Sequence, residues 1–418
     1  MRRTGARCLP LSRARPAATW RRVTGLSAAI GRRSVIASAL TSASQVWIGK
    51  MGQGSRRRRP GRIPLYLQTM CTTNVMRLAM RKRARFGLIV AAVIAMANIA
   101  GCGSDSGATI VNLGGTTVPG TPGEAIWLAF KRDAETASAG RLELRPLIYG
   151  QLGSEEQLLS GLRRGRIQFA NLSAQVTSTV VPELALLYAP YLFDSLAEAD
   201  YVYDTYLTDI YRDLLAAQNL HLITWYEIGF HSIYAKEPIL VPADAAGRRF
   251  RVSSSLNARL FAEAIGADVI PLGFGEIVSS LQTGLIDAGE NSISLYAHTG
   301  ISDEAPHYTQ TRHAFGVSVI VVDLAWWNRL PDADRTILRE SFPSIEESRR
   351  LTRRQDLADL QNPALGIVIH DLNDSQRADW RASMVGVREE LLEAIGGRAG
   401  EIYGVIVAGK AEFAKARP

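Results

Sequence analysis

The amino-acid sequence predicts an α/β fold with two lobes, built on sheets that are mostly parallel. Two observations lead to this prediction. From about residue 109, strand-like and helix-like apolar patterns follow one another along the chain, which is the order of elements in β-α-β units. Roughly 310 residues follow this point, enough for two cores, and 47% of the whole chain is apolar. In folds of this class, ligands bind at the carboxyl ends of the strands.

A first run of elements is expected before residue 174. The first helix ends at Gly140, since glycine is common just past helix ends. Ser154 opens the second helix, and Gln157 follows three residues later with the spacing of a capping box. Strand, helix, strand, helix and strand are predicted, in that order, over residues 108–115, 124–140, 141–150, 154–165 and 166–173.

A second run begins with residues 220–235, an unusually long strand candidate that crosses from one lobe towards the other. Residues 318–330 read as a buried strand and a turn. The long helical zone over 331–360 contains Pro343, which forces a kink or break near Phe342. Ser344 and Glu347 could cap its second half. Between these segments, strands are predicted over 248–252, 268–272 and 285–291, and helices over 255–267 and 274–284.

The formal charge of +8 is concentrated in the N-terminal part of the chain. Residues 1–101 hold 20 of the 48 Lys and Arg residues and none of the 40 acidic residues. From Cys102 onward, 28 basic residues stand against 40 acidic ones, a net charge of −12. An acidic body argues against a nucleic acid partner, because binding to phosphates requires positive charge.

Residues 76–101 have the pattern of a signal peptide. A basic start precedes an apolar run of roughly 15 residues, which is short for a membrane span. The run ends in Ile99–Cys102, which resembles the lipobox of bacterial lipoproteins, so Cys102 is expected to carry a lipid and residues 102–108 to form a tether. An ordinary secretory signal is the alternative. The expected location is periplasmic or extracytoplasmic, with a lipid anchor in the membrane.

Residues 1–75 are rich in arginine, free of acids and without pattern. Because Met76 and Met80 would be natural starts for the signal peptide, the simplest interpretation is an over-long gene model. A twin-arginine signal and a basic disordered tail are the alternatives. After processing, Cys102 would be the only remaining cysteine, so no internal disulfide is expected.

The sequence predicts neither a cofactor nor a metal site. Gly404–Ala411 has the spacing of a phosphate-binding loop, but Ala411 replaces the Ser or Thr that would hold magnesium. The glycines at 273 and 275 lack the third glycine of a dinucleotide fingerprint. None of the six histidines has another at three or four residues' distance, and they form no metal-like cluster in the sequence.

The stretch 281–291 contains two carboxylates that could be an acid and a base. Strand alternation places Asp287 on one face together with Asn291, and Glu290 on the other face. Carboxylates on opposite faces do not flank one bond, as glycoside hydrolysis requires. We therefore interpret Asp287 and Glu290 as groups that hold the strand end in place.

Three blocks of the sequence resemble the solute receptors of tripartite ATP-independent periplasmic (TRAP) transporters. They are Gly247–Val252, Gly266–Asn291 and Pro182–Asp200, and the similarity extends over nearly all of residues 109–415. The resemblance implies a two-lobed periplasmic-binding-protein-like fold of type II, with lobes joined by crossing strands and by a long helix that Pro343 kinks. It places one lobe at 109–228 plus about 317–356, the other at 229–316 plus about 357–405, and a tail at 406–418.

The resemblance also assigns ligand-binding residues. The family's main carboxylate-binding arginine falls on Arg251, whose guanidinium matches a carboxylate with two parallel hydrogen bonds. The family's ligand-binding asparagine falls on Asn291, and its cleft phenylalanine on Phe274, for which core packing is an equal alternative. Ser173 lies at a loop position that touches ligand in relatives. Where many relatives have a second arginine, this chain has His231, so a second carboxylate is less strongly expected.

The resemblance therefore implies a receptor and not an enzyme. The expected ligand is a small organic anion such as a C4-dicarboxylate, keto acid or sugar acid, passed to small and large TRAP membrane subunits. An ABC-type or sensor solute-binding lipoprotein, or less favourably a cleft hydrolase, are the alternatives. Of Trp225 and Tyr226, which alternate on the long strand, one could line the cleft.

Overall fold

The computed structural model describes residues 107–416. The leader, the signal peptide, Cys102 and most of the tether predicted above lie outside these residues. The strands are β1 (Thr109–Gly114), β2 (Leu142–Leu147), β3 (Phe169–Ser173), β4 (Leu220–Ala235), β5 (Arg249–Val252), β6 (Asp268–Pro271), β7 (Ala288–Asn291), β8 (His307–Asp323) and β9 (Val368–His370). They form one sheet in the order β2-β1-β3-β8-β4-β7-β5-β6, with β9 beside β8.

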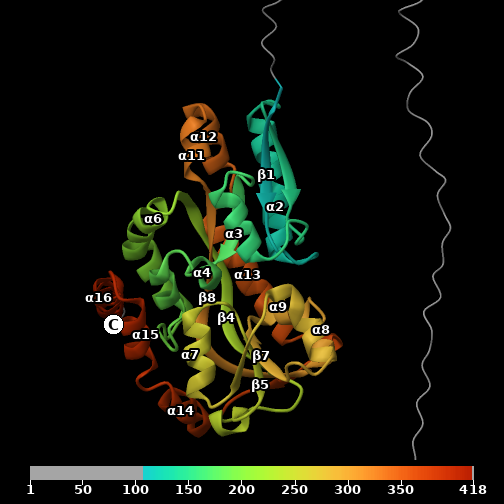
Figure 1. Ribbon diagram of the computed structural model, residues 1–418, viewed down its shortest axis with the longest axis vertical. Helices are drawn as coiled ribbons and strands as arrows, with labels where there is room; N and C mark the ends of the chain where they lie inside the picture. The colour runs from blue at the N-terminus through green and yellow to red at the C-terminus, as the bar shows by residue number, and fades with distance from the viewer. Residues whose placement is uncertain (1–106, 417–418) are drawn as a thin grey trace, which may run out of the picture. The chain divides into compact units, whose positions relative to one another are not determined.

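The long strands β4 and β8 run through the middle of the sheet (Figure 1). We call the end with β1, β2 and β3 the first lobe and the end with β5, β6 and β7 the second lobe. Within each end these strands pair in parallel, as predicted. In the centre the sheet is antiparallel, because β4 pairs with β7 and β8, and β8 with β3, in antiparallel fashion. The chain enters the second lobe along β4 and returns along β8, so these two strands run in opposite directions.

Helices cover both faces of the sheet (Figure 1). Single turns of 3-10 helix at Phe274–Glu276 and Pro363–Leu365, and a longer one at Pro182–Tyr188, join them. No described helix is long and apolar enough to span a membrane. The helices are α2 (Pro122–Ala137), α3 (Glu155–Arg163), α4 (Ala174–Thr177), α5 (Leu196–Val202), α6 (Thr208–Ala216), α7 (Leu256–Ala264), α8 (Ile277–Gln282), α9 (Ile293–Ala297), α10 (Ile301–Glu304), α11 (Leu324–Arg329), α12 (Asp332–Glu340), α13 (Ile345–Leu360), α14 (Asp374–Ser383), α15 (Val387–Ile395) and α16 (Ala399–Ala416).

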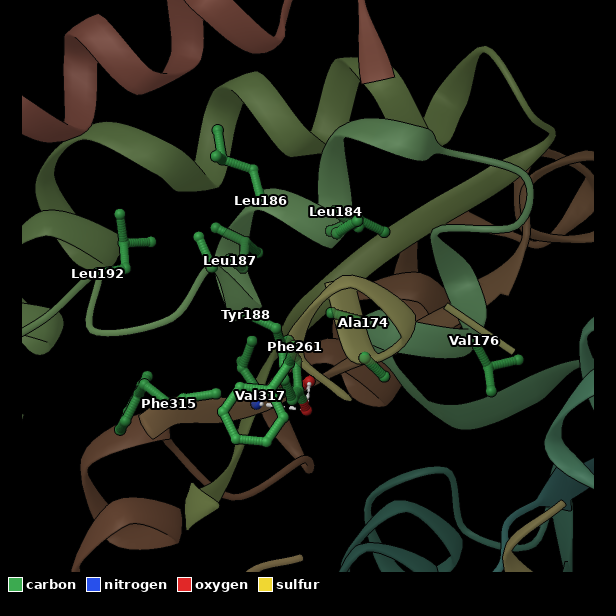
Figure 2. Packing of buried hydrophobic residues seen from close by; sticks show 14 of the residues in the cluster. Ala174, Val176, Leu184, Leu186, Leu187, Tyr188, Leu192, Phe261, Phe315 and Val317 are labelled. Atoms are coloured by element: carbon green, nitrogen blue, oxygen red, sulfur yellow. Dashed lines mark hydrogen bonds between the residues drawn. The ribbon is translucent and has the colours of Figure 1, made fainter. Parts of the chain in front are cut away.

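Three clusters of buried side chains fill the space between helices and sheet. The first-lobe cluster packs Trp127 and Phe130 of α2 against Phe169 of β3 and against Phe342. The second-lobe cluster includes the stacked rings of Tyr296 and Tyr308. The largest cluster contains residues of both lobes, and Figure 2 shows its part around Tyr188 and Val317. There the Tyr188 hydroxyl donates to the Val317 carbonyl oxygen over 3.0 Å.

The predicted break near Pro343 is present. Helix α12 ends at Glu340 and α13 begins at Ile345, where the Ser344 hydroxyl accepts a hydrogen bond from the Glu347 N–H over 3.3 Å. The break precedes α13, so the helix beside β4 is not itself interrupted by proline. Helix α13 contacts α2 of the first lobe, α9 of the second lobe and β4.

The C-terminal segment differs from the expectation of a tail at 406–418. Residues 406–416 belong to α16, which packs on α5 of the first lobe. Ile406 is fully buried, and Lys410 Nζ donates to the Leu192 carbonyl oxygen over 2.6 Å. The apolar spacing in this segment continues the helix, which the sequence reading overlooked. The residue boundaries predicted for the two lobes stay a prediction.

Candidate functional site

A cavity of about 740 Å³ lies at the carboxyl ends of β3, β5 and β7. Its walls come from both lobes and from β4 and β8. Parallel strands that end at one edge bring their last residues together, which is why segments distant in the sequence meet here. All five residues predicted as ligand contacts line this cavity: Ser173, His231, Arg251, Phe274 and Asn291.

Arg251 lies at the end of β5 and is only 6% exposed. Its Nε and Nη2 both donate to the Leu272 carbonyl oxygen, over 3.1 and 2.9 Å. These two bonds occupy the Nε–Nη2 edge of the guanidinium. The Nη1–Nη2 edge stays free. Within residues 107–416, no carboxylate oxygen lies within 4.0 Å of the Arg251 nitrogens. The charges of Glu155, Glu156 and Glu290 act on Arg251 only from farther away. A buried positive charge without an anion in direct contact is unfavourable, so the free edge is suited to receive one.

Asn291 is the last residue of β7 and is 4% exposed. Its Oδ1 accepts a hydrogen bond from the Ser292 N–H over 2.9 Å. Because an N–H needs an oxygen opposite it, this bond determines which way the amide points. Among the described residues the Asn291 Nδ2 has no partner, so the amide can donate to a ligand oxygen.

Two aromatic residues line the cavity from opposite lobes. Phe274, in the 3-10 turn before α8, is half-buried and also packs on the second-lobe cluster, so it belongs to both cavity and core. On β4, Tyr226 lines the cavity, and burial raises the pKa of its hydroxyl to about 12. Trp225 points the other way into the largest core, where its Nε1 donates to the Thr208 hydroxyl.

Ser173 lines the cavity, but its hydroxyl is already engaged. It donates to Glu155 Oε2 over 2.7 Å and accepts from the Val176 N–H over 3.2 Å as the N-cap of α4. Burial raises the pKa of the Glu155 carboxyl, although the two hydrogen bonds from Ser173 act against it. Ser173 therefore lines the cavity, and its hydroxyl also positions the Glu155 carboxylate.

His231 faces a carboxylate of the protein itself. Its Nδ1 hydrogen-bonds Glu290, and both side chains are buried. Burial alone would raise the pKa of Glu290, but the charge and hydrogen bond of His231, together with the charges of His313 and Arg251, outweigh it and hold that pKa well below its usual range. The His231 Nε2 is buried without a partner among the described residues.

Asp287 and Glu290 do not form a pair across the cavity, and neither lines it. Asp287 lies just before β7 and makes two hydrogen bonds with Arg249, at 2.8 and 2.6 Å. With Glu290 bonded to His231, each carboxylate has a different partner in the protein, as expected for groups that hold a strand end.

Several cavity residues were missed by the sequence reading. Asn171 lines the cavity, and its buried Oδ1 has no partner among the described residues. It lies two residues before Ser173 on the same strand face, so period-two alternation could have found it. Glu155 and Glu156 open α3 directly after the capping serine. Acidic residues are common at this place because they stabilise a helix N-terminus, so the sequence did not indicate a role in the cavity.

Comparisons with known proteins identify the family of this chain. The family model DctP, described as bacterial extracellular solute-binding protein, family 7, matches residues 114–394. A solute-binding protein of Chromohalobacter salexigens is 25% identical over 66% of this chain and 82% of its own length. The C4-dicarboxylate-binding periplasmic protein of Rhodobacter capsulatus is 24% identical over 69% of this chain and 87% of its own length.

Solved structures of the same kind superimpose on the fold. A sugar acid binding protein from Advenella mimigardefordensis in complex with galactonate has a TM-score of 0.68 at 22% identity, covering 72% of this chain and 99% of its own. A TRAP periplasmic solute binding protein from Sulfurospirillum deleyianum with bound succinate has a TM-score of 0.67 at 22% identity, covering 72% and 98%. The two-lobed fold is thereby confirmed. With a family match over more than half of its residues, the chain belongs to family 7 of the bacterial extracellular solute-binding proteins, as its resemblance to TRAP solute receptors implied.

Proposed function

We propose that this protein is the extracytoplasmic solute receptor of a TRAP transporter. It binds an organic acid by its carboxylate in the cavity between the lobes and delivers it to the small and large membrane subunits. Candidate ligands are C4-dicarboxylates, keto acids and sugar acids. The observation that carries the proposal is the buried Arg251, whose free guanidinium edge faces a cavity large enough for such an acid.

The chemistry of this edge favours a carboxylate. Two parallel N–H groups match the two oxygens of a carboxylate, and each charge-assisted bond contributes about 1.5 to 3 kcal/mol. The Asn291 amide supplies a further donor from β7. We propose Arg251 and Asn291 as the main ligand contacts, Phe274 as the surface on which the carbon skeleton packs, and weaker roles for His231 and Ser173.

The names of similar proteins support an organic acid. One relative in Escherichia coli is a 2,3-diketo-L-gulonate-binding periplasmic protein, and the one in Rhodobacter capsulatus binds C4-dicarboxylates. Similar structures hold galactonate, D-glucuronate and succinate. Each of these ligands carries at least one carboxylate, which is the group that Arg251 is suited to bind.

We propose a binding role without catalysis. A hydrolase would need two acids, or a nucleophile and a base, facing the bound molecule. The two acids of the stretch 281–291 are turned to Arg249 and His231 instead. An ABC-type or sensor receptor is the alternative within binding proteins, and the match to family 7 favours the TRAP assignment.

We also propose that the lobes move about the centre of β4 and β8. The boundaries predicted at 228/229 and 316/317 fall on the paired residues Gly229 and Gly316. Gly229 has a φ of 98°, and the β4–β8 register shifts between Glu227 and Gly229. A pair without side chains at a bulge is a place where backbone torsion changes cost little.

A lipid on Cys102 is proposed as the anchor of the receptor on the outer side of the membrane. The expected result for the full chain expressed in a bacterium is that it partitions with membranes, whereas Cys102→Ser partitions with the periplasmic fluid. Membrane association that survives this substitution would contradict the lipid anchor without affecting the proposed binding role.

The binding role is tested by a thermal-shift screen of organic acids, followed by calorimetry. A bound acid raises the melting temperature by mass action. Arg251→Lys should weaken binding by about tenfold or more, because lysine keeps the charge but lacks the two parallel N–H groups of the guanidinium. Arg249→Lys is the matched control, since Arg249 lies on the same strand and contacts Asp287. No shift with any acid, or equal affinity in Arg251→Lys, would contradict the proposal.

A further inference from the structure

A second polar cluster forms the cavity wall between α9 and α13. Ser294 and His298 of this cluster line the cavity. Behind them, Asp359 of α13 is buried and Asp356 is half-buried. None of these residues was expected from the sequence to take part in binding.

Asp359, at 3% exposure, is the centre of the cluster. Its Oδ1 lies 2.9 Å from His298 Nε2 and 2.8 Å from Gln355 Nε2, and its Oδ2 lies 2.8 Å from the Ser294 hydroxyl. A buried carboxylate surrounded in this way by potential donors is stabilised in its charged form, as an acceptor.

The Ser294 hydroxyl lies between two carboxyl groups, and its contacts indicate that one of them carries a hydrogen. It lies 2.8 Å from Asp359 Oδ2 and also 2.8 Å from Asp356 Oδ1, yet a hydroxyl carries a single hydrogen. One of the two contacts therefore needs a hydrogen from a carboxyl group. Burial raises the pKa of Asp356 to about 7, and the charges of Glu227 and Asp359 act in the same direction. When Asp356 is protonated, it donates to Ser294, and Ser294 donates to Asp359.

This arrangement determines which nitrogen of His298 carries hydrogen. Because Asp359 is an acceptor, the bond to it requires a hydrogen on His298 Nε2. In the neutral imidazole, Nδ1 is then an acceptor. Among the described residues, His298 Nδ1 has no hydrogen-bond partner. In its neutral form, His298 therefore offers an acceptor from the cavity wall.

Other groups of the cavity are acceptors as well. Asn171 Oδ1 is buried without a partner among the described residues, and the carboxylates of Glu155 and Glu156 line the same cavity. Arg251 and Asn291 receive one carboxylate, and a second carboxylate next to these groups would face acceptor oxygens. A hydroxyl group would donate to them.

We propose that His298, positioned by Asp359, is a specificity-determining residue that accepts a hydrogen bond from a hydroxyl group of the bound acid. The inference rests on the proposed binding of an organic acid at Arg251. The ligand class that fits is an acid with one carboxylate and several hydroxyl groups. A site built to bond a hydroxyl discriminates against analogues without it, because its own polar groups are then left unpaired.

The test compares two six-carbon acids, D-galactonate and hexanoate, with succinate as the dicarboxylate. In the wild-type protein, galactonate is expected to bind at least about tenfold more tightly than either. His298→Phe removes the acceptor and should lower the galactonate affinity by about tenfold while changing that for succinate little. His221→Phe is the control, because His221 stacks on Trp327 away from the cavity.

A second measurement needs no substitution. In protein labelled with ¹⁵N at histidine, the His298 resonances should show hydrogen on Nε2, and Nδ1 should shift on addition of galactonate but not of succinate. Hydrogen on Nδ1, or a wild-type preference for succinate or hexanoate, would overturn the inference.

The two proposals can fail separately. If acids bind and Arg251→Lys weakens them, but His298→Phe leaves the ratio of galactonate to succinate affinity unchanged, the role of His298 is wrong and the receptor stands. If no acid binds the wild-type protein, the proposed function is wrong.

Discussion

At the scale of single residues, the candidate site depends on which polar groups the protein leaves unused. Arg251 and Asn291 each hydrogen-bond the backbone with one edge or atom of the side chain and leave another edge or atom free. Their positions could be predicted because the blocks around them resemble a known family. The bond between His231 and Glu290 could not be predicted, since it depends on the register between β4 and β7.

Replacement of Asn291 tests the donor role of its amide. Asn291→Asp keeps the oxygen that accepts from the Ser292 N–H but replaces the free donor with a negative charge. We expect acid affinity to fall by more than about tenfold at pH 7, measured by calorimetry. Asn373→Asp, at the exposed N-cap of α14, is the control and should bind normally. Undiminished affinity in Asn291→Asp would remove this residue from the site.

Glu290 is expected to act on stability and not on chemistry. Glu290→Gln replaces the buried carboxylate that His231 Nδ1 contacts with a neutral amide, and loss of this charge-assisted hydrogen bond costs about 1.5 to 3 kcal/mol of unfolding free energy. Denaturant unfolding at pH 7 measures this loss. Glu263→Gln breaks an exposed pair with Arg259 and should cost under about 1 kcal/mol. Equal stability of the two variants would show that the buried pair is not formed.

At the scale of elements, most strands and helices could be predicted because their apolar periodicity is regular. The first half of β8 was missed for a physical reason. His231 pairs with Ala314 and Ile233 with Thr309, so β8 bulges outward between them. Arg312 in this bulge has a φ of 45°, and its N–H donates to the Ser232 hydroxyl. A bulge interrupts the period-two pattern by which strands are identified.

The contact between α13 and α9 predicts a dependence of stability on pH. Asp356 has a pKa of about 7 in the folded protein, raised first by burial, against a usual value of 3.8. The folded state therefore holds the proton more tightly, and this contribution is complete below about pH 4 and lost as the pH rises to about 7. Its size is at most about 4 kcal/mol.

Asp356→Asn should remove the loss of unfolding free energy that Asp356 causes between about pH 4 and pH 7. An amide can donate to Ser294 at every pH. Unfolding free energies between pH 4 and pH 8 measure the effect. Asp332→Asn, in an exposed pair with Arg335, should follow the wild-type profile. A profile of Asp356→Asn that runs parallel to the wild type over the whole range would contradict the assigned proton.

At the scale of the whole molecule, side-chain hydrogen bonds near the cavity join the two lobes. The Ser254 hydroxyl donates to Glu156 Oε1 over 3.0 Å, and Gln175 Nε2 lies 3.5 Å from Glu290 Oε1. The acidic charge of the body was readable from composition. The contacts between lobes were not, because each joins segments that are roughly a hundred residues apart and carry no common pattern.

Ser254→Ala removes one of these contacts and should open the lobes more readily. We expect the dissociation rate of a bound acid to rise a few-fold, with the association rate nearly unchanged, as for loss of one hydrogen bond. Stopped-flow tryptophan fluorescence follows both rates. Ser341→Ala, after α12, serves as control. A slower association with unchanged dissociation would contradict a role in holding the lobes together.

The path of α16 has a practical consequence for protein engineering. The helix returns to the first lobe, where Gly409 lies against the Tyr206 ring. A chain cut at residue 405 would lose buried Ile406 and uncover part of the largest core, which invites aggregation. A reporter protein or affinity tag is therefore better fused after residue 416, beyond the end of the helix.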